Sequence, residues 1–359
     1  MADSKQAPLD AAAAAKAAFA SVQDKPFPND IFTVPELRWA VIGCGVIANQ
    51  MAQSLALAGR KLTGVANRTL TKAQTFADQY GVEKVYDTVE DLYADPDIDA
   101  VYITTPHNTH ITYLRAALSA GKHVLCEKAI TLTSAELDEA RAIAAEHNVV
   151  LMDATTVLHM PLYQELRRRM DAGEFGRMNL AQLNFGSYKE YGDLTNRFYN
   201  RNLAGGAMLD IGVYALSVMR LFMASQPVEV VSLGNTCETG VDVAGGIVCR
   251  NAEQQLGVVS LTLHSKQPKR SVISFDNCYI EVNEYPRADH ATIVWTADGH
   301  REEVAAGTEA YALCYEMADL EQAVAGDDSK RELLDYASDV MELMTKLRAD
   351  WGVVYPEEE

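Results

Sequence analysis

From Leu37 to about residue 155, short apolar segments alternate with longer amphipathic segments. RWAVIGCG, KLTGVANR, DAVYITTP, KHVLCEK and VVLMDAT are typical of buried strands, and the stretches between them have the apolar spacing of helices. This alternation constrains the fold strongly, because strands separated by helices form a parallel sheet that is covered on both faces. We therefore expect residues 37–155 to form a Rossmann-type, doubly wound parallel sheet.

The second half of the chain has a different pattern. Helices are predicted over PLYQELRRRMDAGEFG and MLDIGVYALSVMRLFM, whereas strand-like runs such as MNLAQLNFG, QLGVVSLTLHS and ATIVWTAD are separated by turn residues alone. We expect residues 156–359 to form an α/β domain with an open, mostly antiparallel sheet. Two final helical stretches, over 309–325 and 329–349, can pack back on the first domain. Residues 1–36 are interpreted as an accessory helix, over 8–22, and a proline-containing linker.

Composition excludes several classes of function. The formal net charge is −19, which disfavours binding to nucleic acids and to anionic membranes. The six cysteines are scattered without a CxxC pattern, so neither a metal site nor a disulfide framework is predicted, and a reducing, cytoplasmic location is expected. No apolar stretch is expected to span a membrane, and the N-terminus lacks the features of a secretory signal.

The most specific motif in the first half is Gly43-Cys44-Gly45-Val46-Ile47-Ala48, which follows a predicted strand and opens a predicted helix. It matches the G-x-G-x-x-G/A pattern of dinucleotide-binding turns. We expect Gly43 to make the tight turn, and Gly45 to let the backbone approach a pyrophosphate at the helix N-terminus, with Val46 and Ile47 beside it. The alternative is a glycine turn that binds nothing.

The end of the second strand bears on the choice of cofactor. NAD-preferring sites place an acidic side chain there, but this chain has Asn67-Arg68-Thr69, and Lys72 follows one helical turn later. Arg68 can pair with a 2′-phosphate and stack on adenine. The sequence therefore favours NADP(H), with NAD(H) possible, and the alternative is that Arg68 is a solvated surface residue.

Two further segments carry candidate catalytic residues. Glu127 and Lys128 end an apolar strand, where a parallel sheet opens to ligands, although such a pair is often a simple surface pair. In AGGAMLDIGVY, Asp210 and Tyr214 are four residues apart and so share a helix face in an apolar environment. The alternative for these two residues is a helix cap and a core tyrosine.

Taken together, GxGxxA, TTPHNTH (104–110), CEK and AGGAMLDIGVY resemble the Gfo/Idh/MocA oxidoreductases. GRMNLAQLNFG, ETGVD (238–242) and WGVVYP are similar to the branch of dimeric dihydrodiol and NADP-dependent D-xylose dehydrogenases. The resemblance implies an NAD(P)-dependent oxidoreductase that transfers hydride between nicotinamide and a hydroxyl or carbonyl of a sugar, polyol or cyclic diol. It also implies a homodimer or higher homo-oligomer formed through the antiparallel sheet.

The same resemblance assigns roles to individual residues. Lys128, Asp210 and Tyr214 become the catalytic group, with Tyr214 as acid and base and a nearby Lys128 ammonium favouring its phenolate form. Glu127 is placed near the nicotinamide ribose, and the cofactor loop contributes Thr105, Pro106, Asn108 and His110. Two positions depart from the family pattern, because Ala129 replaces a proline and Leu158 replaces a basic or polar residue.

The segment before the glycine turn of AGGAMLDIGVY mixes polar and aromatic residues, as sugar-binding loops do. Candidate substrate contacts are Tyr191, Arg197, Tyr199 and, from TTVLHMP, His159. The alternative is an ordinary surface loop. A second hypothesis for the whole chain is a non-catalytic regulator that senses nucleotide on the same fold.

Overall fold

The computed structural model describes residues 16–22 and 25–359. The chain divides into two compact units. The first contains the chain up to Thr131, Ala135–Ala154 and Ala310–Asp335, and the second contains Leu132–Ser134, Thr155–Glu309 and Tyr336–Glu359. Residues 16–22 are helical, and the rest of the helix expected over 8–22 lies outside the described residues.

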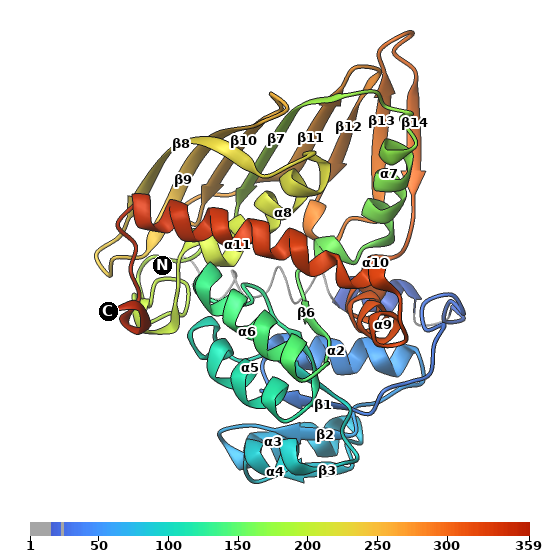
Figure 1. Cartoon of the computed structure of the whole chain (residues 1–359), viewed down its shortest axis with the longest axis vertical. Coiled ribbons are helices and arrows are strands. Elements are labelled where there is room, and N and C mark those ends of the chain that lie inside the picture. Colours follow the sequence, from blue (N-terminus) through green and yellow to red (C-terminus); the bar gives the residue numbers. More distant parts are fainter. Residues whose placement is uncertain (1–15, 23–24) are drawn as a thin grey trace, which may run out of the picture. The chain divides into compact units, whose positions relative to one another are not determined.

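The first unit is built on a six-stranded parallel sheet with strand order β3-β2-β1-β4-β5-β6 (Figure 1). This is the strand order of the dinucleotide-binding Rossmann fold. The strands are β1 (Trp39–Ile42), β2 (Gly64–Ala66), β3 (Lys84–Tyr86), β4 (Ala100–Ile103), β5 (His123–Cys126) and β6 (Leu151–Asp153). The helices are α2 (Val46–Leu57), α3 (Leu70–Tyr80), α4 (Val89–Ala94), α5 (His110–Ser119), α6 (Ser134–Glu146), α9 (Ala312–Val324) and α10 (Asp328–Arg331).

Helix α9 packs into the core of this first unit although it lies far along the chain. Leu313, Met317 and Leu320 belong to the same apolar cluster as the sheet residues. The buried Glu321 of α9 accepts a hydrogen bond of 3.0 Å from Trp39 Nε1 and pairs with Arg60. The carboxylate therefore keeps partners inside the core, as buried charges require.

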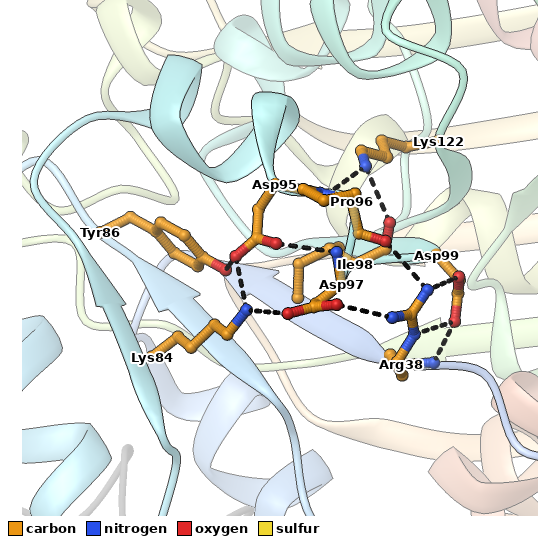
Figure 2. A network of polar contacts seen from close by, with 9 residues as sticks. All are labelled: Arg38, Lys84, Tyr86, Asp95, Pro96, Asp97, Ile98, Asp99 and Lys122. Atoms are coloured by element: carbon orange, nitrogen blue, oxygen red, sulfur yellow. Dashed lines mark hydrogen bonds and ion pairs between the residues drawn. The ribbon is translucent and has the colours of Figure 1, made fainter.

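A polar network joins the amino ends of four strands of the same sheet (Figure 2). Lys84 Nζ contacts Asp95 Oδ2 at 2.7 Å, and the Tyr86 hydroxyl donates to the same oxygen at 2.7 Å. Arg38 pairs with Asp99, and Lys122 Nζ donates to the backbone oxygens of Asp95 and Ile98. Apart from Tyr86, which is the last residue of β3, these residues precede or begin a strand. The network is therefore structural rather than part of the ligand-binding edge at the carboxyl ends of the strands.

The second unit contains an eight-stranded sheet with order β14-β13-β12-β11-β7-β10-β9-β8. All neighbours are antiparallel except β7 and β10, which are parallel. The strands are β7 (Met178–Gly186), β8 (Pro227–Thr236), β9 (Asp242–Asn251), β10 (Leu256–Thr262), β11 (Gln267–Phe275), β12 (Cys278–Asn283), β13 (His290–Trp295) and β14 (Arg301–Ala305). The helices are α7 (Pro161–Asp171), α8 (Val213–Phe222) and most of α11 (Leu333–Asp350).

The two faces of this sheet differ. Helix α8 packs against β7, β10 and β11 on one face, as Figure 1 shows. On the other face, Val231 is 75% exposed, Leu233 is 83% exposed, and Val231 pairs in register with the exposed Val248. The sheet therefore has a strip of apolar side chains that residues 16–22 and 25–359 leave exposed.

One helical stretch corrects the expectation that no segment is apolar enough to span a membrane. Arg201–Phe222 has the length and a mean hydropathy of 1.3 over its most apolar window, but 83% of that window is buried. Such burial is typical of a core helix. Each of the six cysteines is a free thiol.

Candidate active site

The glycine turn between β1 and α2 has the geometry of an anion-binding turn. Gly43 has φ +103°, and a Cβ there would lie 2.6 Å from Thr104 Oγ1, so only glycine is accommodated. Gly45 is the N-cap of α2 with no side-chain cap, and a Cβ on it would have no atom within 4 Å. Space is therefore open beside Gly45 at the start of α2, where the first amides of a helix have no intrahelical partner, which suits a cofactor pyrophosphate.

Two exposed cations lie on the chain just after β2. The side chains of Arg68 and Lys72 form no hydrogen bond or ion pair with residues 16–22 or 25–359. Lys72 is close enough to the turn that its charge acts on the Cys44 thiol, although burial outweighs it and raises the pKa of Cys44 to about 11. Asn67 is tied locally, because its Nδ2 donates to Thr69 O at 3.0 Å. This part of the site is therefore positively charged and lacks a carboxylate at the strand end.

The loop after β4 is held by His110 from within. The ring is fully buried, with Nε2 2.8 Å from Thr105 O and Nδ1 3.0 Å from Ala129 O. Burial lowers the pKa of His110, and the hydrogen bonds to the backbone carbonyls act in the opposite direction. The two ring nitrogens face backbone carbonyls and so join this loop to the turn after Lys128. The place of the His110 loop along the cofactor stays a prediction.

The other predicted residues of this loop lie nearer the surface. Pro106 is exposed, and Thr105 and Asn108 are half-buried. Thr109 Oγ1 lies 2.7 Å from Pro106 O and 2.8 Å from Thr105 Oγ1, which fixes the first turn before α5. The loop thus keeps Thr105, Pro106 and Asn108 at the carboxyl edge of the sheet, where Rossmann folds bind their ligands.

Glu127 and Lys128 leave the end of β5 at that same edge. The buried Tyr102 on the neighbouring strand donates its hydroxyl to Glu127 Oε1, and Glu127 N donates to Ile103 O at 3.0 Å. Lys128 is half-buried, and its positive charge contributes to the lowered pKa of His110.

Two residues near this strand end were not predicted from the sequence. One is Tyr102, and the other is Asp153, a buried carboxylate at the end of β6 in register with Cys126. The position of Asp153 at a strand end was the available signal.

In the second unit, a tight turn precedes the helix that carries Asp210 and Tyr214. A Cβ on Gly205 would lie 2.6 Å from Arg197 O, and Gly206 has φ +127°. Residues Met208–Gly212 form a π-helix, which passes into α8 at Val213. Short π-helical turns are frequent at functional sites. The single α-helix expected over this stretch is therefore wrong at its first turn.

Asp210 and Tyr214 both lie in the interior of this unit, but each keeps some exposure to solvent. Asp210 is 8% exposed and its Oδ1 lies 3.3 Å from Arg197 Nη2, whose side chain is 60% exposed. The Tyr214 ring is half-buried and lies 6.1 Å from the Phe185 ring. Lys128 belongs to the first unit, and its approach to these two side chains stays a prediction.

The predicted substrate residues fall into two groups. Tyr191 is 38% exposed and Arg197 stacks over Phe198 at 4.3 Å, so both side chains reach the surface of their loop. Tyr199 is fully buried, packs against Tyr191 at 5.1 Å and donates its hydroxyl to Lys189 O at 3.0 Å. Tyr199 therefore supports the loop, which corrects its expected role as a substrate contact. His159 is likewise fully buried.

No group of three or more His, Cys, Asp or Glu within residues 16–22 and 25–359 is arranged to hold a metal ion.

Comparisons with known proteins agree on one family. Residues 37–155 match the model described as an oxidoreductase family with an NAD-binding Rossmann fold, and residues 163–281 match its GFO/IDH/MocA C-terminal domain. A trans-1,2-dihydrobenzene-1,2-diol dehydrogenase from Xenopus tropicalis is 31% identical over 66% of this chain and 72% of its own length. The Xenopus laevis enzyme of the same name is 27% identical over 89% of this chain and 99% of its own length.

Solved structures show the same fold. The 3-ketoreductase KijD10 from Actinomadura kijaniata, in complex with NADP and TDP-benzene, has a TM-score of 0.75 at 25% identity and covers 88% of this chain and 98% of its own. A levoglucosan dehydrogenase in complex with NADH and levoglucosan has a TM-score of 0.76 at 20% identity, covering 87% of this chain and 97% of its own. The sequence matches, the Rossmann strand order and the mostly antiparallel second sheet place this chain in the Gfo/Idh/MocA family of NAD(P)-binding oxidoreductases.

Proposed function

We propose that this protein is a dehydrogenase or reductase that interconverts a hydroxyl and a carbonyl on a sugar, polyol or cyclic diol. The observation that carries the proposal is the pair Asp210 and Tyr214 on the π-helix and α8, where a carboxylate and a phenol sit in an apolar helix whose start is fixed by a glycine turn. Membership of the oxidoreductase family supports the reaction type. The dihydrodiol dehydrogenases among the relatives support the substrate class.

The roles of the chain's own residues follow from their chemistry. The nicotinamide, when bound, accepts or supplies the hydride. The Tyr214 hydroxyl gives its proton to the carbonyl oxygen as the alcohol forms, and takes it back in the opposite direction. Lys128 favours the phenolate form of Tyr214 if the two groups approach as we propose. Asp210, paired with Arg197, orients the substrate hydroxyls.

The cofactor is held by the first unit. Gly43 and Gly45 shape the turn at the N-terminus of α2, and the open amides there receive the pyrophosphate, with Val46 and Ile47 in the same first turn. Thr105, Pro106, Asn108 and Glu127 line the carboxyl edge toward the nicotinamide side. Arg68 and Lys72, with Asn67 beside them, give the preference for NADP(H), because a 2′-phosphate needs cationic partners at the end of β2.

The substrate end of the site is assigned to Tyr191 and Arg197, whose side chains reach the surface of their loop. The apolar strip around Val231, Leu233 and Val248 supports assembly as a dimer through the outer face of the second sheet, since monomers rarely leave such strips uncovered. We also propose a cytoplasmic location, supported by six free cysteines.

The proposed function is tested with a substrate panel of aldoses, inositols and trans-dihydrodiols, each supplied with NADP⁺ or NAD⁺. Reduced nicotinamide is followed by its absorbance. We expect turnover with at least one member of the panel, and faster turnover with NADP⁺. Tight binding of the nucleotide without turnover of any hydroxyl or carbonyl compound would instead favour a nucleotide-sensing regulator.

A further inference from the structure

A buried carboxylate outside the proposed catalytic group lies beside the turn that precedes it. Asp242, the first residue of β9, is fully buried. Its Oδ2 accepts a hydrogen bond of 2.6 Å from the backbone amide of Met208, which is the first residue of the π-helix. Its Oδ1 lies so close to Gly206 that a Cβ there would be 2.3 Å away. Asp242 therefore fits against this turn only because position 206 is glycine.

The same turn is held from a second direction. The fully buried Tyr355 donates its hydroxyl to Gly205 O at 2.6 Å. Tyr355 is in turn fixed by the segment around it, since its amide donates to Glu358 Oε2 at 2.7 Å. Arg348 of α11 pairs with both oxygens of Glu358 at 3.0 and 2.9 Å and lies 4.8 Å over the Tyr355 ring. Both Gly205 and Met208 thus have buried partners from distant parts of the second unit.

A buried carboxylate is costly to retain unless it is hydrogen-bonded or paired with an opposite charge. Burial raises the pKa of Asp242 to about 6, whereas the amides of Met208 and Ala207 and the Arg348 guanidinium act in the opposite direction. The group is consequently ionised at neutral pH. An anion at the start of a helix accepts from its first free amides, which are otherwise without partners.

We propose that Asp242 is a positioning residue for this enzyme, fixing the first amide of the π-helix and thereby the orientation of Asp210 and Tyr214. Tyr355 is a second positioning residue for the same turn, because its hydroxyl donates to the carbonyl of Gly205. Asp210 lies two residues after Met208, and its own amide donates to Gly206 O at 3.2 Å, so a shift of the turn is passed directly to it. The role in turnover rests on the function proposed above.

The test compares Asp242→Ala, Asp242→Asn and Tyr355→Phe with Ser271→Ala. Ser271 is another fully buried polar residue of the same sheet, on β11, and is not in the turn. We expect Asp242→Ala to lower kcat at least ~30-fold while the cofactor dissociation constant stays within about twofold, as for an interaction that acts on the chemical step alone. Asp242→Asn keeps an acceptor for the Met208 amide and should recover most of that loss. Ser271→Ala should leave kcat unchanged.

Hydrogen exchange provides a readout that does not depend on turnover. Amides over residues 206–214 should exchange faster in Asp242→Ala and in Tyr355→Phe, while strands β11 and β12 exchange as in the wild type. Unchanged exchange and unchanged kcat in Asp242→Ala would overturn the proposal, even if Tyr214→Phe is inactive. If Asp242→Ala does not fold, Tyr355→Phe decides, because it deletes one hydroxyl, and wild-type values for both readouts would contradict the role of the turn. Full activity of Tyr214→Phe would refute the proposed function, leaving the exchange measurement to test the turn.

Discussion

At the scale of single residues, we propose that the charge at the end of β2 sets the preference of the first unit between NADP(H) and NAD(H). Arg68 and Lys72 are exposed, and no carboxylate within the part of the chain that the structure describes pairs with them. The whole protein has a formal net charge of −19, so an anionic phosphate approaches it only where cations gather locally. Arg68 and Lys72 form such a local cluster of cations.

Arg68→Ala should weaken NADPH binding at least ~10-fold and change NADH binding less than about twofold, because only NADPH carries the 2′-phosphate that a guanidinium pairs with. Dissociation constants are measured by fluorescence titration of each reduced cofactor. Arg115→Ala is the matched control, since Arg115 is an exposed arginine of the same unit that pairs with Glu139. Equal weakening of NADPH and NADH by Arg68→Ala would refute the assignment.

The sequence made part of this site predictable. Gly43, Gly45, Lys128, Asp210 and Tyr214 could be identified because each belongs to a short motif next to a strand end or on a helix face. The partners that hold them could not, since they come from elsewhere in the chain.

Three examples show this limit. Tyr102 holds Glu127 from the next strand, and Asp242 and Tyr355 reach the glycine turn from 34 and 150 residues away. The motif places His110 on the loop after β4, but only its burial between two carbonyls shows that its ring faces inward.

At the scale of elements, strands and helices of the first unit follow the period of their apolar residues, and the parallel sheet was predicted on that basis. Some elements carry no such signal. The edge strand β14, REEVA, is mostly charged, which protects a sheet edge but hides the strand from pattern analysis. The π-helical turn at Met208 was also missed, because its residues read as an ordinary apolar helix.

The polar network at the amino ends of β1, β3, β4 and β5 makes a testable contribution to stability. Hydrogen bonds from Lys84, Tyr86 and the Asp97 amide hold the pKa of Asp95 well below its usual range (Figure 2). A carboxyl whose pKa is lowered by folding stabilises the protein above its unfolded pKa, near ~3.9, and that contribution is lost as the pH falls below this value. Asp95→Asn should therefore destabilise the protein at neutral pH, by about 3 °C in Tm, with the difference shrinking toward pH ~3.

Thermal unfolding followed by circular dichroism across this pH range checks the prediction. Asp87→Asn serves as the control, because Asp87 is exposed and forms no hydrogen bond or ion pair with the described residues. A Tm difference for Asp95→Asn that stays constant from neutral pH down to pH ~3 would show that the charge of Asp95 does not contribute.

At the scale of the whole molecule, the order of a parallel-sheet unit followed by a mostly antiparallel unit was predictable from the change in pattern near residue 155. The sequence allowed the final helices to pack back on the first domain, but the contacts that place α9 there, above all the buried Glu321 with Trp39 and Arg60, have no local signal. The second sheet leaves an apolar face whose occupant we propose to be a second copy of the chain.

Replacing Val231 and Leu233 together by Asp should convert the protein from a dimer to single chains, because two carboxylates cannot be buried in an apolar interface without partners. Light scattering measures the result against the chain mass of 39.3 kDa, with about twice that value expected for the wild type. Leu70→Asp, which adds a charge at an exposed leucine of the first unit, should leave the mass unchanged. A wild-type mass near that of one chain would contradict the dimer.

The measurement that tests the central claim most directly is the turnover of Tyr214→Phe on the best substrate of the panel, together with its NADPH dissociation constant. The substitution removes one hydroxyl and keeps the ring that packs against Phe185. We expect kcat to fall at least ~100-fold while NADPH binding stays within about twofold, and Tyr279→Phe on the outer sheet face to behave as the wild type. Wild-type turnover by Tyr214→Phe would contradict the account, because the proton would then have to come from another group.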